Sequence, residues 1–250
     1  MTPAWKQIPF FRWSFWRMAV GMPHLLSKWQ VGDGREQRLA EYVTRHARRG
    51  DAEDVIRVID EYAYNESFLI NVGDEKGRIV DDAIRRVKPA RVLELGAYCG
   101  YSALRMAVAA PEAQITSIEF NADNARISRG IWEHAGVSDR VTAVVGSLGD
   151  GGVTRRRLRD ELGFSRDSLD FVFIDHDKDA YLPDLHAILE EGWLRKGAIV
   201  VADNVKFPGA PEYRAYMTAN EGKRWKTVEH ETHVEYQSVF KDLVLVSELV

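Results

Sequence analysis

Five short apolar segments, each separated from the next by a stretch of helix length, constrain the fold of this chain most strongly. They are rich in β-branched residues and cover residues 92–95, 115–118, 141–145, 169–174 and 199–202. Strands that are apolar nearly throughout are typical of a parallel sheet whose two faces are both covered by helices. Their alternation with helices therefore predicts an α/β fold, a three-layer sandwich around a mostly parallel sheet.

The two ends of this pattern differ from its middle. Before it, helical periodicity predicts three helices, over residues 35–48, from Asp51 or Asp54 through Tyr62, and over residues 74–87. After it, residues 226–231 and 239–246 are joined by a connection that is too short for a helical crossover. These two segments are therefore expected to pair antiparallel at one edge of the sheet.

Residues 1–30 differ in composition from the rest of the chain. They carry Lys6, Arg12, Arg17 and Lys28, no acidic residue, and four of the seven tryptophans. The formal net charge of the whole chain is −4, so residues 31–250 carry a net −8. The composition predicts a basic, aromatic N-terminal extension, residues 1–30, on an acidic globular domain, residues 31–250. An acidic domain argues against nucleic acid as a partner, because a protein that binds phosphates presents a basic face.

The extension is not expected to be a transmembrane helix or a signal peptide. Charged residues and Pro23 interrupt it, and no apolar run in it approaches the ~18 residues that a membrane-spanning helix needs. It is expected either to pack on its own domain or on a second copy, or to lie on a membrane surface. A cytoplasmic monomer or homodimer is expected, with membrane association through the extension as the alternative. The single cysteine, Cys99, excludes an intramolecular disulfide framework and suits a reducing compartment.

Ligands of an open α/β sheet bind beyond the carboxyl ends of its strands. After the first strand, Gly96 and Gly100 permit a tight turn, and a helix begins near Ser102 with free N–H groups. Their G-x-x-x-G spacing differs from the G-x-G-x-x-G fingerprint and argues against an NAD-dependent dehydrogenase. Glu119, at the end of the second strand, can accept hydrogen bonds from both hydroxyls of a ribose. The two strand ends together indicate a nucleoside site.

Acidic and amide side chains follow the fourth and fifth strands. Asp175 ends the fourth strand, and Asp203 and Asn204 end the fifth. Their three oxygen ligands suit Mg²⁺, whereas a zinc site would be expected to recruit histidine or cysteine. The sequence therefore predicts a magnesium site beside the nucleoside site.

Several motifs of this chain resemble those of the catechol O-methyltransferases. They are N-V-G-D-E-K-G at 71–77, V-L-E-L-G-A-Y-C-G-Y-S at 92–102, F-I-D-H-D-K-D-A-Y-L-P-D at 173–184, A-D-N-V at 202–205 and V-E-Y at 234–236. The resemblance runs in order from about residue 32 to the C-terminus. It implies the Rossmann-like class I fold of methyltransferases that use S-adenosylmethionine, with a seven-stranded sheet and an antiparallel C-terminal edge strand. It also implies Mg²⁺-dependent transfer of a methyl group to one hydroxyl of a catechol.

The resemblance assigns a role to individual residues. Asp175, Asp203 and Asn204 match the Mg²⁺ ligands of the family, Lys178 its catalytic lysine, and Glu235 the acid that holds the second hydroxyl. Positions that bind S-adenosylmethionine correspond to Asn71, Val72, Glu94, Gly96, Tyr98, Ser102, Glu119, Phe120, Ser147, Asp175 and His176. Positions that bind the acceptor correspond to Phe68, Ile70, Lys178, Asn204, Pro208, Val234 and Glu235.

Some positions depart from the family pattern. The family has a tryptophan near the adenine where this chain has Asp177, and usually a serine and a glutamine in place of Leu148 and Gly149. These changes are expected to remove apolar cover and polar partners from the adenine pocket and to weaken cofactor binding. Lys206 and Phe207, before Pro208, also differ, which leaves the preferred acceptor open.

Alternative functions remain at this point. Larger vicinal-diol phenolics, such as a caffeoyl thioester or a flavonoid, are methylated by relatives with the same three metal ligands. A catalytically silent binding protein is another alternative, against which the presence of Lys178 and Glu235 argues. Cys99 is interpreted as a small packing residue rather than a nucleophile. His230 and His233 are expected on the surface or in the core rather than on a metal.

Overall fold

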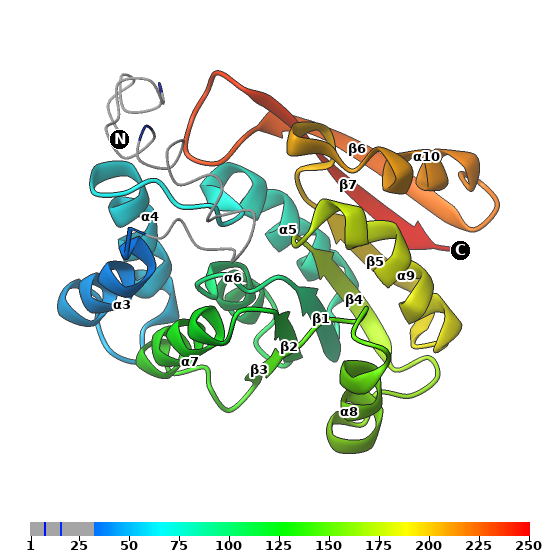
Figure 1. Cartoon of the computed structure of the whole chain (residues 1–250), viewed down its shortest axis with the longest axis horizontal. Helices are drawn as coiled ribbons and strands as arrows, with labels where there is room; N and C mark the ends of the chain where they lie inside the picture. The colour runs from blue at the N-terminus through cyan, green and yellow to red at the C-terminus, as the bar shows by residue number, and fades with distance from the viewer. Residues whose placement is uncertain (1–7, 9–15, 17–32) are drawn as a thin grey trace.

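The computed structural model describes residue 8, residue 16 and residues 33–250, which form a seven-stranded sheet flanked by helices (Figure 1). The strands are β1 (Arg91–Leu95), β2 (Gln114–Glu119), β3 (Val141–Val145), β4 (Leu169–Ile174), β5 (Leu194–Ala202), β6 (Trp225–His233) and β7 (Lys241–Leu249). The α-helices are α3 (Arg35–His46), α4 (Ala52–Asn65), α5 (Gly73–Val87), α6 (Tyr101–Ala109), α7 (Ala122–Ala135), α8 (Val153–Leu162), α9 (Tyr181–Glu190) and α10 (Pro211–Ala219). Two short turns of helix, η3 (Lys178–Ala180) and η4 (Val205–Gly209), follow β4 and β5.

The strand order in the sheet is β3-β2-β1-β4-β5-β7-β6. The first five strands in this order pair parallel, and β7 pairs antiparallel with both β5 and β6. The predicted mostly parallel sheet with an antiparallel C-terminal edge is therefore confirmed.

Alternate residues of the central strands enter two separate cores. On β4, Phe171 and Phe173 join a core with α3 to α7, whereas Val172 and Ile174 join a core with α8, α9 and α10. Side chains of a strand point alternately to its two faces, so a strand buried on both faces is apolar at most of its positions. The three predicted layers follow from this arrangement (Figure 1).

Local hydrogen bonds explain where the element boundaries differ from the expected ones. The side chain of Asp51 accepts from the amide of Asp54 at 3.0 Å, so Asp51 caps α4 and the helix begins at Ala52. Strand β7 begins at Lys241 rather than at residue 239. The side chain of Gln237 accepts from two amides and donates to two carbonyls within residues 234–240, which closes a turn there instead.

The turn after β1 brings two strand ends together. Gly96 has a φ of 99°, and a Cβ at this position would clash with the carbonyl oxygen of Asp175. Only glycine satisfies both the backbone conformation and the close approach. The ends of β1 and β4 therefore lie in contact at the edge of the sheet where ligands were expected.

No helix within the described part of the chain is long and apolar enough to cross a membrane. The expectations for the extension, packing on the domain or on a second copy and contact with a membrane surface, concern residues 1–30. Apart from positions 8 and 16, these lie outside the described residues.

Candidate active site

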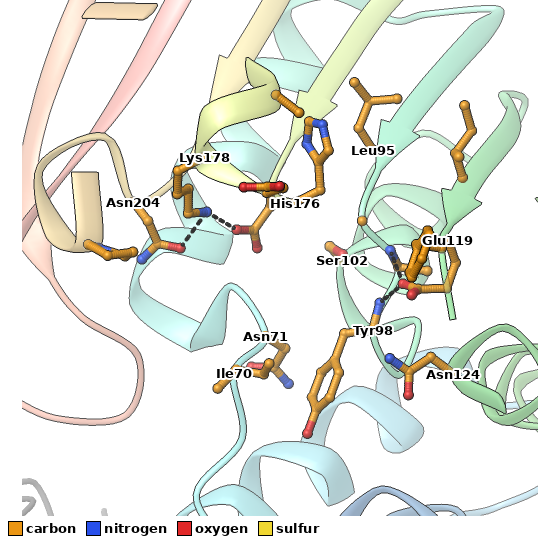
Figure 2. Close-up of a pocket in the computed structure, with 18 of the residues that line it drawn as sticks. Ile70, Asn71, Leu95, Tyr98, Ser102, Glu119, Asn124, His176, Lys178 and Asn204 are labelled. Carbon is orange, nitrogen blue, oxygen red and sulfur yellow. Dashed lines mark hydrogen bonds and ion pairs between the residues drawn. The ribbon is translucent and has the colours of Figure 1, made fainter. Parts of the chain in front are cut away.

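A cavity of about 740 Å³ lies along the carboxyl ends of the parallel strands. Its wall combines residues that follow every parallel strand with residues from the turn between β6 and β7. Figure 2 shows Tyr98, Glu119, His176 and Asn204 from the ends of four of these strands. The predicted site residues in this wall are Phe68, Ile70, Asn71, Gly96, Tyr98, Ser102, Glu119, Phe120, Ser147, Asp175, His176, Lys178, Asn204, Pro208, Val234 and Glu235. The fold thus brings together residues that are dispersed over more than half of the sequence.

Glu119 fixes the geometry of one half of the cavity. Its Oε2 accepts from the backbone amides of Ala97 at 3.1 Å and Tyr98 at 2.8 Å, and its Oε1 accepts from the amide of Asn121 at 2.8 Å. Burial raises the pKa of Glu119 above its ordinary value, and these amides oppose that shift. The carboxylate therefore ties the end of β2 to the turn after β1 while it faces the cavity (Figure 2).

Two polar atoms in the wall are buried without a hydrogen-bond partner among the described residues. Asn71 accepts from the amide of Gly73 at 3.1 Å through Oδ1, but its Nδ2 is unpaired. His176 pairs with Asp184 through Nε2 at 2.8 Å, but its Nδ1 is unpaired. Because an unpaired buried polar atom costs free energy, these atoms indicate hydrogen bonds that a ligand supplies.

Three predicted residues, Val72, Glu94 and Asp203, do not line the cavity. Glu94 is fully buried behind the wall, where the hydroxyls of Ser102 and Ser117 each donate to one of its oxygens. Burial raises the pKa of Glu94 to about 7. In this structure Glu94 braces Ser102 from behind, which differs from the direct contact with the cofactor that the resemblance implied.

The positions that depart from the family pattern, Leu148, Gly149 and Asp177, all line this cavity. Asp177 and Gly149 line the cavity, and neither supplies the large side chain, tryptophan or glutamine, that the family has at its position. Leu148 offers no polar partner at its position, and its side chain, 2% exposed, joins the core beneath the cavity. Phe120 also lines the cavity and is 66% exposed, so it supplies a further apolar surface there.

Lys178 lies at the other half of the cavity, between two predicted metal ligands. Its Nζ is 3.0 Å from Oδ1 of Asp175 and 3.3 Å from Oδ1 of Asn204 (Figure 2). Its third contact, at 2.5 Å, is the hydroxyl of Tyr181, which in turn donates to the carbonyl of Asp203 at 2.9 Å. Burial raises the pKa of Tyr181 well above its ordinary value, so this hydroxyl stays protonated.

A buried cluster of three carboxylates lies directly behind Asn204. One oxygen from each of Asp203, Glu235 and Asp242 falls within 4.8 Å of the others. The Nζ of Lys76 contacts all three, at 2.8 Å, 2.5 Å and 3.1 Å respectively. Burial raises the pKa of Asp203, Lys76 opposes this shift, and the neighbouring carboxylates add to it.

The donor set fits a hard divalent cation. Oδ2 of Asp203 is buried and has no hydrogen-bond partner among the described residues. Oδ1 of Asp175 and Oδ1 of Asn204 both lie within 3.3 Å of the Nζ of Lys178, so the two oxygens face one shared space. Carboxylate and amide oxygens are ligands that Mg²⁺ prefers.

Lys76, Tyr181 and Asp242 are the residues of this site that sequence reasoning missed. Lys76 and Tyr181 belong to the motifs that carry the resemblance, which was a usable signal for them. Asp242 stands at the start of β7 in no recognisable motif, and only the pairing of that strand with β6 brings it to the site.

Comparisons with known proteins place this arrangement in a family. The family model for O-methyltransferases matches residues 51–229. A probable O-methyltransferase of Mycobacterium tuberculosis is 57% identical over 231 residues, which are 92% of this chain and 99% of that protein. A catechol O-methyltransferase of Bos taurus is 41% identical over 214 residues, which are 85% of this chain and 76% of that protein.

A solved structure shows the same fold. The O-methyltransferase from Bacillus cereus in complex with SAH superposes with a TM-score of 0.62, at 19% identity, over 85% of this chain and 97% of that chain. The expected class I methyltransferase fold is thereby confirmed. With the family model matched over most of the domain and with relatives this similar, the chain belongs to the O-methyltransferase family.

Proposed function

We propose that this protein transfers a methyl group from S-adenosylmethionine to one hydroxyl of a catechol-type acceptor in a Mg²⁺-dependent reaction. The observation that carries the proposal is the convergence of Lys178, Asp175, Asn204 and Glu235 at one end of a single cavity. The other end of the same cavity holds the glycine turn and Glu119. A base, a set of oxygen ligands and a nucleoside site therefore share one space.

The half of the cavity around Glu119 is the proposed site of S-adenosylmethionine, which supplies the methyl group. Glu119 would accept from the ribose hydroxyls, and the free Nδ2 of Asn71 would donate to the carboxylate of the methionine part. Phe120 would cover the adenine. Ser102, held by Glu94, keeps the first turn of α6 in place beside the ligand.

The half around Lys178 is the proposed acceptor site. Asp175, Asp203 and Asn204 would hold Mg²⁺, which when bound stabilises the ionised form of a vicinal diol and fixes both of its oxygens. Lys178, as the neutral amine, would accept the proton of the reacting hydroxyl. The cofactor would supply the methyl group to that oxygen, with cleavage of its sulfur–methyl bond and S-adenosylhomocysteine as the leaving group. Glu235 accepts a hydrogen bond from the second hydroxyl.

Two aromatic rings in the cavity wall, Phe207 and Phe240, favour the larger phenolic acceptors as a second candidate. Phe207 is 50% exposed and stacks against Phe240, with ring centroids 6.0 Å apart and planes 10° from parallel. Both rings line the cavity next to Pro208 and Val234. A flat substituent beyond the diol ring would pack on this surface. A panel that compares catechol with caffeoyl esters and flavonoids distinguishes the two acceptor classes.

A methyl-transfer assay on catechol, with and without Mg²⁺, tests the proposal. The wild type is expected to need Mg²⁺, and Lys178→Ala is expected to lose about 100-fold or more in kcat, the usual range for a general base. Cofactor affinity is the control and should be unchanged in the variant. Activity without Mg²⁺, or full activity of Lys178→Ala, would contradict the mechanism. Absence of methylation of every vicinal diol would favour a silent binding protein.

A further inference from the structure

Lys76 is a fully buried cation at the centre of the carboxylate cluster, and the proposed mechanism does not use it. It extends from the first turns of α5, and its side chain is 1% exposed. Asp203 follows β5, Glu235 lies in the turn after β6, and Asp242 belongs to β7, yet all three contact its Nζ. One ammonium group thus joins the helix to three segments of the sheet edge.

The positive charge of Lys76 compensates the three carboxylates that surround it. Burial alone would lower the pKa of this lysine, but Asp203, Glu235 and Asp242 raise it well above its ordinary value. Removing one partner from a buried charge cluster leaves the others uncompensated, which is costly. The Nζ of Lys76 thus lies within 3.1 Å of three buried carboxylates, directly behind the acceptor site.

The contacts of Lys76 leave one oxygen available on two of the three carboxylates, Asp203 and Glu235. On Asp203, Oδ1 receives Lys76 and the amide of Asn204 at 2.7 Å, which leaves Oδ2 unpaired. On Glu235, Oε1 receives Lys76 and Nδ2 of Asn204 at 2.9 Å. The other oxygen, Oε2, has no hydrogen-bond partner among the described residues, and Glu235 lines the cavity.

Asp242 completes the same arrangement without lining the cavity. Its Oδ2 receives Lys76 and Nδ2 of Asn204 at 2.8 Å, and its Oδ1 receives the amide of Phe207 at 3.0 Å. Both oxygens of Asp242 thus accept hydrogen bonds. Through them this residue connects Lys76, Asn204 and η4.

We propose that Lys76 is a positioning residue that holds one oxygen of Asp203 and one of Glu235, so that Oδ2 of Asp203 faces the metal and Oε2 of Glu235 faces the acceptor. The inference rests on the proposed function. It extends that function in one respect. Lys76, which lies outside the cavity wall, orients both the metal ligand Asp203 and the acceptor-binding residue Glu235.

The experiment compares Lys76→Met, which nearly keeps the volume, with Lys76→Arg, which keeps the charge. Mn²⁺ affinity is measured by electron paramagnetic resonance in the absence of cofactor and acceptor, and KM and kcat for catechol are measured with Mg²⁺. Arg195→Met is the matched control, because Arg195 pairs with Asp170 at the opposite ends of β4 and β5. It should leave all three values unchanged.

Lys76→Met is expected to weaken both readouts. Mn²⁺ should bind more weakly, because Asp203 loses the contact that holds its Oδ2 towards the metal. The KM for catechol should rise about tenfold, the effect of losing one charge-assisted hydrogen bond. Lys76→Arg should restore both values towards the wild type. In the Glu235→Gln background, Lys76→Met should add no further increase in KM, because it acts through Glu235.

Unchanged Mn²⁺ affinity and KM in Lys76→Met would overturn the proposal, as would weakening that Lys76→Arg does not restore, because Lys76 would then be a purely structural residue. If Lys76→Met does not fold, the double variant Lys76→Met/Asp242→Asn removes one charge of each sign, and the increase in KM is still expected. A wild type that methylates no diol would refute the proposed function alone. The Mn²⁺ affinity of the variants would still test the orientation of Asp203.

Discussion

At the scale of single residues, Asp60 lies outside the cavity but is hydrogen-bonded to the segment that carries Glu235. Its Oδ1 accepts from the hydroxyl of Tyr101 at 2.6 Å and from that of Tyr236 at 3.0 Å. Tyr101 in turn accepts from Arg105 at 3.0 Å. Tyr236 follows Glu235 directly and has a φ of 51°, in the left-handed region that is uncommon for tyrosine. Asp60 therefore anchors α4 to the turn that carries Glu235.

The pH dependence of stability is a prediction about Asp60. Burial raises its pKa from 3.8 to about 6 in the folded protein. The folded state therefore retains the proton that the unfolded state loses, and the stability that this residue contributes is present below pH 3.8 and lost as the pH rises through 6. The free energy of unfolding of the wild type relative to Asp60→Asn should fall by up to ~3 kcal/mol across this window.

Urea titrations of both proteins at several pH values measure this difference directly, because contributions common to the two proteins cancel. A difference that stays constant across the window would show that Asp60 ionises in the folded protein as it does in the unfolded chain.

At the scale of elements, the segments that follow β3 and β4 line the cavity in which we propose that S-adenosylmethionine binds. Gly149 lines the cavity, has no heavy atom within 4 Å of a Cβ built on it, and does not adopt a positive φ. A side chain would therefore fit there without strain. Asp177 accepts from the amide of Asp179 at 3.2 Å and caps η3, so it stabilises the segment that carries Lys178.

Gly149→Gln is expected to increase the affinity for S-adenosylmethionine several-fold, because it supplies one polar partner of about 1 kcal/mol beside the adenine. Asp177→Trp should act in the same direction by adding apolar cover. Isothermal titration calorimetry gives both values. Gly130→Gln on α7 is the control, since Gly130 also has open space but lies outside the cavity. Unchanged affinity in both cavity variants would contradict the expectation that the family departures weaken cofactor binding.

At the scale of the whole molecule, the proposed division into an extension and a catalytic domain is open to a direct test. Every residue that we assign to the cavity, and both described cores, come from residue 39 onward. Deletion of residues 1–30 is therefore expected to leave methyl transfer and cofactor affinity at their full-length values.

Two further measurements on the truncated protein distinguish the roles of the extension. If it packs on the domain or on a second copy, its removal should lower the melting temperature or change the oligomeric state, while the fraction bound to anionic vesicles should not change. A loss of vesicle binding would instead support contact with a membrane surface.

The sequence by itself determined the layered sheet and the position of the site. Apolar runs such as residues 169–174 are buried on both faces in any arrangement, and strand direction then places Asp175, Asp203 and Asn204 at one edge. Gly96 was predictable in the same way, because the close turn it permits is a local property of the backbone. These features depend on residues that are near one another in the chain.

Only the tertiary structure decided which buried charged groups pair and which carboxylate oxygens accept hydrogen bonds. Lys76 and Glu235 are 159 positions apart, and their contact exists because α5 packs across the sheet edge that β6 and β7 complete. The same packing put Glu94 behind the cavity wall, where Ser102 and Ser117 occupy it, although the resemblance assigned it to the cofactor. Periodicity specifies which face of an element is buried, but the partner of a buried charge depends on how distant elements are placed.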